Sequence, residues 1–133
     1  MWVSPEGRTK MPYIATNPRA YDGKVVGSGH CVAFVQAASG APNTSVWKEG
    51  KLVKGEPAIT TGTAIATFSA AGKYTNSLDG TSHAAIYVQQ NTSGILVWDQ
   101  WLGQPVHQRR IRFQAGAPGV KPVNDGDFFY VIE

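Results

Sequence analysis

The chain has 133 residues, a length that suits one domain with a hydrophobic core of its own. Hydrophobic residues make up 42% of it and charged residues 16%, proportions that argue against a disordered chain. The formal charge is only +3 and most basic residues are scattered, so nucleic-acid binding is not expected. No apolar run approaches the roughly 20 residues of a membrane helix, so membrane insertion is not expected either.

The first ten residues do not resemble a signal peptide. They lack a continuous apolar segment and include Pro5, Glu6, Arg8 and Lys10. Because Met11 follows, we interpret residues 1–10 as a disordered lead-in, a tag or an alternative start within a single domain spanning residues 1–133. We expect synthesis in the cytoplasm, and any export would use a route that reads no ordinary signal peptide.

The clearest helix is predicted between Ser28 and Gly40. Ser28 can cap its N-terminus, and Gly40 with Pro42 can end it. One face is apolar, with a spacing of i, i+3, i+4 and i+7: Cys31, Phe34, Val35 and Ala38.

The rest of the chain is predicted to be largely β. Strands are expected over residues 63–68, 83–89, 94–101, 106–113 and 127–132, with turn residues at 91–94 making the second and third strands a hairpin. Residues 43–60 show no clear period and are interpreted as a long loop or short helical turns. The sequence therefore predicts an α+β fold in which one N-terminal helix packs on an antiparallel sheet of about five strands.

Cys31 lies in the first turn of the predicted helix, after Gly27 and Gly29. The free amides and positive dipole end of a helix favour a thiolate, and the same amides can receive an oxyanion. The alternative is that Cys31 is a buried filler on the apolar face of the helix, as free cysteines often are. A single Cys excludes an internal disulfide, and no spacing of Cys and His residues indicates a metal site or a cofactor.

His83 opens a predicted strand, where an imidazole could meet the thiol. Pairing across the hairpin places Gln100 opposite His83, with Asp99 and Trp101 diagonal to it, and a shift of one residue would put Asp99 opposite His83. Asp99 alternates with apolar residues, so the carboxylate needs a partner, and orienting His83 would supply one. Gln100 is the alternative orienting residue. The other reading is a solvated histidine and a partly exposed aspartate at strand ends.

The remaining histidines are given lesser roles. His30 is interpreted as a rim residue beside the thiol, and His107 as a packed or edge residue. Trp101 is the aromatic residue expected nearest the site. Arg109 belongs to a short basic group in the fourth strand, together with Arg110 and Arg112, which indicates at most a weak preference for anionic partners.

These segments, in this order, resemble the NlpC/P60 superfamily and its CHAP branch. The matching pieces are GSGHCVAFVQ, VWKEGKLVKG, GTAIATF, SHAAIYVQ and VWDQW, which span residues 27–101. The chain also resembles small bacterial proteins of this size, some of them grouped with type VI secretion amidase effectors. CHAP proteins usually have Glu and, two residues later, Asn in the last motif, where this chain has Asp99 and Trp101. An upstream Tyr or Gln often completes the oxyanion hole, and Tyr21 is too loosely spaced to be assigned that role.

The resemblance implies a papain-like cysteine amidase or endopeptidase that cuts peptidoglycan stem peptides through a thioester. Cys31 would be the nucleophile, His83 the general base and Asp99 the orienting residue. An injected effector would act in the periplasm and would be paired with an immunity protein. Two alternatives stay open: a hydrolase or transamidase acting on another amide, and a non-catalytic binding module with a buried Cys31.

Overall fold

The computed structural model describes residues 2–3 and 9–133 of the chain. Its helices and strands follow in this order: β1 (Trp2–Val3), β2 (Thr9–Lys10), η1 (Pro18–Tyr21), α1 (Cys31–Ser39), η2 (Thr44–Val46), β3 (Glu49–Leu52), β4 (Ala64–Thr67), β5 (Ala84–Gln90), β6 (Gly94–Trp101), β7 (Gln104–Arg112), η3 (Pro122–Asn124), η4 (Gly126–Phe128) and β8 (Phe129–Ile132). The η elements are short 3₁₀ turns.

The main sheet has six strands in the order β3-β8-β4-β5-β6-β7, and every neighbouring pair is antiparallel. Five of these strands are the predicted ones. The sixth, β3, lies within residues 43–60, which were predicted to be a loop or helical turns. Its residues are mostly exposed, because β3 is an edge strand, so it shows neither the alternation nor the apolar run of a buried strand.

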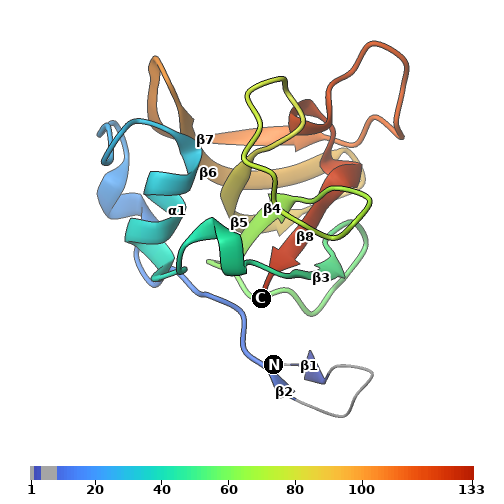
Figure 1. The fold of residues 1–133 in the computed structure, drawn as a ribbon, viewed down its shortest axis with the longest axis horizontal. Helices are drawn as coiled ribbons and strands as arrows, with labels where there is room; N and C mark the ends of the chain where they lie inside the picture. The colour runs from blue at the N-terminus through green and yellow to red at the C-terminus, as the bar shows by residue number, and fades with distance from the viewer. Residues whose placement is uncertain (1, 4–8) are drawn as a thin grey trace.

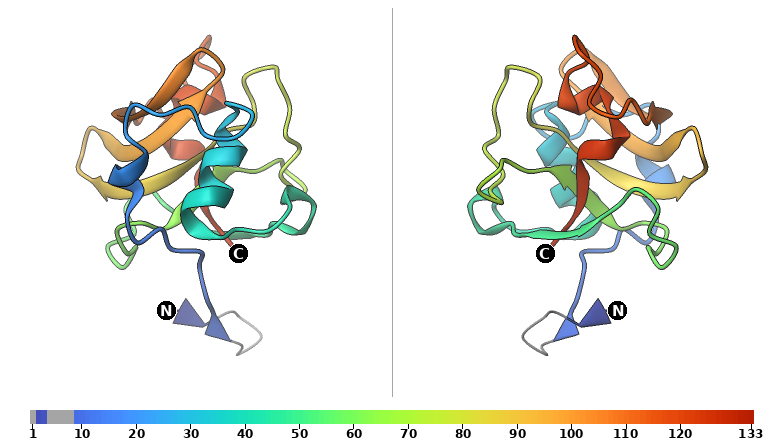
Figure 2. Two further views of the ribbon diagram at one scale, coloured as in Figure 1. Left: turned by 90° about the vertical axis from the view of Figure 1, so that its left-hand side faces the viewer. Right: turned by 90° about the vertical axis from the view of Figure 1, so that its right-hand side faces the viewer.

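The helix α1 covers one face of the sheet and packs against β5 and β6 (Figures 1 and 2). Phe34 and Val35 of the helix are fully buried in a hydrophobic cluster that includes Ile86 and Trp98. A second cluster, which includes Ile65, Val97 and Phe129, lies on the strand positions that alternate with these. The sheet therefore has apolar residues on both faces, and the predicted α+β arrangement of one helix on an antiparallel sheet is confirmed.

The helix starts later than predicted. It begins at Cys31, and His30 is its N-cap with no side-chain capping hydrogen bond. The Ser28 hydroxyl instead accepts a hydrogen bond from the amide of His30 at 3.4 Å. The predicted C-terminal end is confirmed, because Gly40 adopts the left-handed conformation with φ of 75°. Cys31 is thus the first residue of the helix.

The β5–β6 hairpin is also confirmed, but the predicted register is wrong by one residue. Ile86 pairs with Trp98 and Tyr87 with Val97, and a bulge separates these pairs from the Gln89–Leu96 pair. Continuing this register places His83 and Asp99 on the same face of the sheet and Gln100 on the opposite face. A bulge adds a residue to one strand only, and no local sequence pattern marks it.

Most of the expected lead-in lies outside the described residues, which omit residue 1 and residues 4–8. Next to that gap, β1 and β2 form a separate two-stranded antiparallel pair. Among the described residues, no helix has both the length and the apolar character needed to span a bilayer.

Candidate functional site

The thiol of Cys31 lies at the N-terminal end of α1, where the helix meets the sheet. Cys31 is half-buried, and its neighbours Phe34 and Val35 fix the helix on the core. The amide of Ala33 donates to the carbonyl of His30 at 3.2 Å, whereas the amide of Cys31 donates to none of the described residues. This amide and the positive end of the helix dipole are therefore available to an anion beside the thiol.

His83 and Asp99 form a buried pair. Nε2 of His83 lies 2.7 Å from Oδ2 of Asp99, and the aspartate is fully buried. Because Nε2 is used in this hydrogen bond, Nδ1 is the ring nitrogen that remains for the thiol of Cys31. The structure thus brings together the three residues predicted from the sequence, in the geometry of a thiol, an imidazole and an orienting carboxylate.

The electrostatics of the site favour a thiolate–imidazolium pair. Burial alone would raise the pKa of the Cys31 thiol, but a hydrogen bond from His83 and its positive charge outweigh burial and lower that pKa. Burial alone would lower the pKa of His83, but its hydrogen bonds to Asp99 and Cys31 raise it to about 9. The two shifts have opposite signs because each ion stabilises the other.

Tyr74 is a member of the site that the sequence analysis did not identify. Its hydroxyl lies 3.7 Å from Sγ of Cys31 and contributes to lowering the pKa of that thiol. The ring is buried and packs against Trp47 and Phe68. No local pattern marks Tyr74, because it lies in the irregular segment between β4 and β5. Tyr21 does not take this place, since its hydroxyl donates to the carbonyl of Ala37.

Asp99 also binds the fourth-strand residue Arg109. Nε of Arg109 donates to Oδ2 of Asp99 at 2.8 Å, and its guanidinium lies 5.0 Å from the centre of the Trp101 ring. Burial would raise the pKa of Asp99, but His83 and Arg109 together lower it. Nε2 of His107 lies 3.0 Å from Oδ1 of Asp99, yet the two atoms are not aligned as a hydrogen bond and neither has another partner among the described residues.

Gln100 does not orient His83, which corrects the alternative left open by the sequence. Its side chain is fully buried on the other face of β6 and holds the segment that precedes α1. It accepts from the amide of Val26 at 3.0 Å and donates to the carbonyls of Val26 and His30 at 2.9 and 2.8 Å. Gln100 therefore fixes the position of the helix N-terminus rather than the imidazole.

An open cavity of about 480 Å³ borders the pair. Cys31 and His83 line it together with Trp101, Arg109 and the exposed His30. The Trp101 ring lies 6.4 Å from the His83 ring, so Trp101 is beside the site as expected. However, Phe129 lies at the same distance from His83, and the Tyr74 hydroxyl lies closer to the thiol, at 3.7 Å. His30 is on the rim, as predicted, whereas His107 lies against the buried carboxylate.

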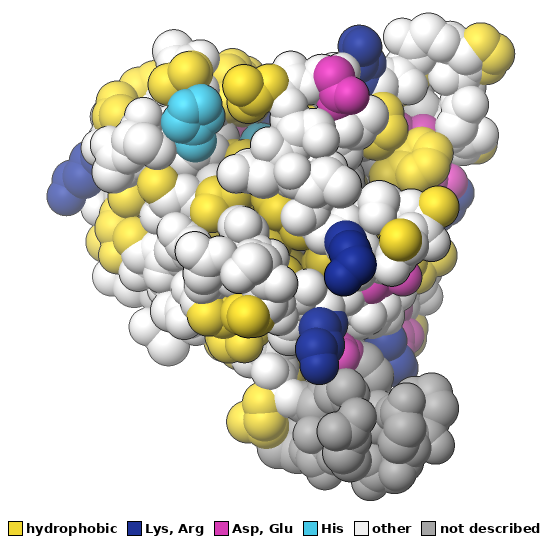
Figure 3. Space-filling view, in the orientation of Figure 1, with side chains coloured by type: hydrophobic (Ala, Val, Ile, Leu, Met, Phe, Trp, Pro, Cys, Tyr) yellow, Lys and Arg dark blue, Asp and Glu magenta, His cyan; other side chains and the backbone are white. Residues whose placement is uncertain are grey.

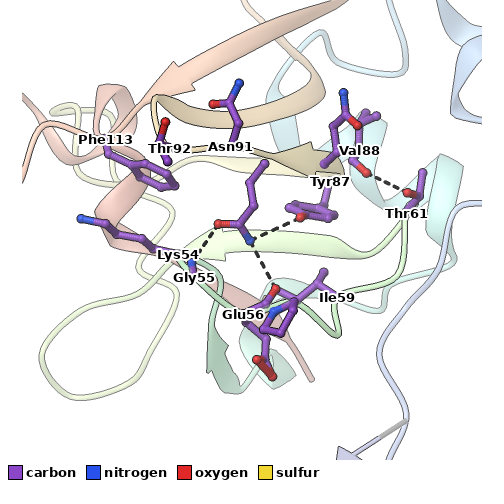
Figure 4. Close-up of a pocket in the computed structure, with 13 residues that line it drawn as sticks. Lys54, Gly55, Glu56, Ile59, Thr61, Tyr87, Val88, Asn91, Thr92 and Phe113 are labelled. Carbon is purple, nitrogen blue, oxygen red and sulfur yellow. Dashed lines mark hydrogen bonds between the residues drawn. The ribbon is translucent and has the colours of Figure 1, made fainter.

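A larger cavity, of about 750 Å³, lies away from this site, between residues 54–61, the β5–β6 turn and Phe113 (Figure 4). Gln90 braces its wall by donating to the carbonyl of Val53 and accepting from the amide of Gly55, both at 2.8 Å. None of its lining residues is a Cys, Ser or His. It has neither a thiol nor an imidazole, so the smaller cavity, which has both, is the better candidate for chemistry.

Charged groups of both signs are mixed on the face of the molecule that Figure 3 shows. On the face shown in Figure 3, positive and negative side chains are interspersed with white and yellow surface. Within the described part of the chain, no group of three or more His, Cys, Asp and Glu side chains is arranged to hold a metal ion.

The fold is that of papain-like proteins related to the NlpC/P60 cysteine amidases. The solved structure of a protein named type 6 secretion amidase effector 2 superimposes with a TM-score of 0.80 at 33% identity, covering 92% of this chain and 95% of that one.

More closely, the chain belongs to the domesticated amidase effector 2 family, whose model matches residues 7–132. A type VI secretion amidase effector 2 protein from Salmonella typhi is 34% identical over 135 residues, covering 92% of this chain and 100% of the relative. Domesticated amidase effector 2 from Ixodes scapularis is 39% identical over 126 residues, covering 89% and 82% respectively. The resemblance to amidase effectors found in the sequence is thereby confirmed.

Proposed function

We propose that this protein is a cysteine amidase that cleaves the stem peptides of peptidoglycan. The observation that carries the proposal is the buried contact of His83 with Asp99 beside the Cys31 thiol, in a chain of an amidase effector family. A binding module would not need a thiol whose pKa is lowered by an imidazole, since a structural cysteine is inert when buried.

The proposed first half-reaction forms a thioester. Sγ of Cys31 attacks the amide carbonyl carbon, and the oxyanion that forms is received by the free amide of Cys31 at the start of α1. His83, as the imidazolium, gives its Nδ1 proton to the departing amine as the carbon–nitrogen bond breaks. Tyr74 does not line the cavity, so its hydroxyl is assigned to the thiolate rather than to the oxyanion.

The second half-reaction releases the acid. His83, now neutral, takes a proton from a water molecule, whose oxygen attacks the thioester carbonyl. The carbon–sulfur bond breaks, the carboxylic acid leaves and the thiolate–imidazolium pair is restored. Asp99 keeps its charge throughout and holds the imidazole through Nε2.

We also propose delivery by a type VI secretion apparatus and action in the periplasm of a target cell. The supporting observation is the similarity over nearly the whole chain to a type VI secretion effector from Salmonella typhi. A producing cell would then need an immunity protein that blocks the cavity at Cys31. Expression directed to the periplasm of a susceptible bacterium should cause lysis, and lysis by Cys31→Ala at the same level would contradict the proposal.

The direct test is digestion of purified Gram-negative peptidoglycan by the wild type and by Cys31→Ala. The wild type should release fragments whose masses identify the broken amide bond, and the variant should release none. Circular dichroism of both proteins controls for folding. Absence of cleavage by a folded wild-type protein would overturn the assignment of substrate.

A further inference from the structure

Arg109 has donors that its contact with Asp99 does not use. Only Nε donates to the buried carboxylate, at 2.8 Å, and the terminal nitrogens donate to no described residue. A guanidinium has five N–H donors, so four remain after this bond. The side chain is partly exposed and lines the cavity that contains Cys31 and His83.

The cavity has an uneven distribution of charge. Arg109 is the only lysine or arginine among the residues that line it, and none of those residues is an aspartate or a glutamate. Asp99, which balances part of this charge, is fully buried and does not line the cavity. The one anion that lines the cavity is the Cys31 thiolate, which is paired with the His83 imidazolium. The open side of the guanidinium therefore has no carboxylate of its own in this space, where water is its alternative partner.

The position of Arg109 is fixed relative to the reacting groups. Its Nε and Nε2 of His83 share the same oxygen of Asp99, at 2.8 and 2.7 Å, and Trp101 packs along the guanidinium. A carboxylate bound by the terminal nitrogens would thus lie on the imidazole side of the cavity. Since one residue of extended peptide spans about 3.5 Å, that carboxylate would belong to a residue close to the cleaved amide.

From these observations we infer that Arg109 binds a free carboxylate of the substrate, and that the enzyme prefers peptides with an ionised carboxyl group beside the cleaved amide. This inference rests on the proposed amidase function and adds to it a class of substrate. A peptide in which that carboxyl is a primary amide keeps its shape but loses the charge-assisted, bidentate contact. Arg109 is then a specificity-determining residue as well as a support for Asp99.

The test uses a cross-linked muropeptide and the same muropeptide with its carboxyl groups converted to primary amides. Wild type, Arg109→Gln and Arg109→Lys are compared on both substrates, with the exposed Arg112→Gln as the matched control. The wild type and Arg112→Gln should lose about 10- to 100-fold in kcat/KM on amidation, mainly through KM, as expected for one charge-assisted contact. Arg109→Gln should cut both substrates at nearly equal rates, and Arg109→Lys should keep part of the preference.

The ratio of kcat/KM between the two substrates distinguishes recognition of the substrate carboxylate by Arg109 from its support of Asp99. If Arg109→Gln lowers both rates but keeps the wild-type ratio, Arg109 acts only on the carboxylate of Asp99 and the inference is overturned. A wild type that cuts both substrates equally would overturn it as well, while leaving the proposed function intact.

Binding to catalytically inactive proteins keeps the two proposals distinct. Calorimetry with Cys31→Ala should show tighter binding of the unmodified muropeptide than of the amidated one, and Cys31→Ala/Arg109→Gln should bind both alike. This result would support the inference even if the wild type cleaved neither. Equal affinity of Cys31→Ala for both peptides, or binding of neither, would overturn it.

Discussion

The buried carboxylate of Asp99 contacts three side chains that can carry positive charge. Oδ2 accepts from both His83 and Arg109, while Oδ1 faces His107. A carboxylate in this environment is tolerable only because its partners compensate for lost hydration. The aspartate therefore sets the charge of the imidazole, and through the imidazole it sets the reactivity of the thiol.

Replacing Asp99 by Asn tests this dependence. Without the negative charge, the pKa of His83 should fall and that of Cys31 should rise, because the imidazolium that stabilises the thiolate is depleted. The rate of iodoacetamide alkylation, followed against pH, should show its midpoint at higher pH. kcat/KM should fall by about 10²- to 10⁴-fold.

The exposed Asp22 offers a matched control for Asp99→Asn. Asp22→Asn removes the same charge at an exposed position outside these contacts and should leave both the alkylation midpoint and kcat/KM unchanged. An unchanged midpoint in Asp99→Asn would show that the carboxylate does not influence the thiol.

Tyr74→Phe removes one hydroxyl and leaves the ring in its packed position. The thiolate loses a hydrogen-bonding group at 3.7 Å, so the pKa of Cys31 should rise and the rate should fall by roughly 10-fold. The measurements are the alkylation profile and kcat. Tyr21→Phe is the control, because its hydroxyl bonds to the carbonyl of Ala37 instead. Equal behaviour of the two variants would remove Tyr74 from the site.

At the scale of elements, the site depends on the junction between the segment before α1 and strand β6. Gln100 connects them through hydrogen bonds to both backbone groups of Val26 and to the carbonyl of His30. The bonds are local in space but join parts of the chain that lie far apart in sequence. They hold the first turn of the helix at the edge of the cavity.

Gln100→Leu keeps the volume and removes these bonds. Because partly buried backbone groups of Val26 and His30 are left without partners, the free energy of unfolding should fall by about 1–3 kcal/mol. Urea denaturation measures this loss. Gln104→Leu, at a partly exposed position whose amide group bonds only to a neighbouring carbonyl, should change it by less than about 0.5 kcal/mol. A comparable loss in both variants would contradict the role of Gln100.

The sequence predicted the helix and most strands better than it predicted the register and the contacts between them. The apolar spacing in α1 and the apolar or alternating patterns of β4 to β8 are local signals, and each of these elements is present. Strand β3 was missed because its exposed edge residues leave no period. The contact of His83 with Asp99 was predicted because a carboxylate among apolar residues needs a partner, not because the strand register required it. The register could not be predicted, since the bulge in β5 decides which residues of β5 and β6 share a face.

The supporting residues of the site were beyond sequence reasoning for the same reason. Tyr74 comes from an irregular segment, and Arg109 is one of three arginines in β7, which differ only in what they face. Selecting the arginine that reaches Asp99 requires the β6–β7 register, in which Val97 lies opposite Arg109 and Asp99 opposite His107.

At the scale of the whole molecule, the raised pKa of His83 makes stability depend on pH. The folded state holds the proton of His83 more tightly than the unfolded chain, whose pKa is 6.5, and its own pKa is about 9. The resulting stabilisation is fully present below pH 6.5 and is lost as the pH rises through the folded-state value.

This dependence is best measured in Cys31→Ala, where the thiol does not titrate and Asp99 still raises the pKa of His83. The free energy of unfolding should decrease as the pH rises above 6.5, by less than the pKa shift of the wild type would give, because Cys31 no longer contributes to raising the pKa of His83. In Cys31→Ala/His83→Asn this decrease should disappear. An equal decrease in both proteins would assign it to other groups.

Cys31 precedes its partners in the sequence, which affects when its thiol becomes reactive during synthesis. During synthesis the thiol emerges before Tyr74, His83, Asp99 and Arg109, and α1 cannot be braced until Gln100 of β6 has followed. A partly synthesised chain therefore carries an ordinary, mostly protonated thiol. Reactivity arises only when the central strands have closed on the helix, so folding itself acts as the activation step.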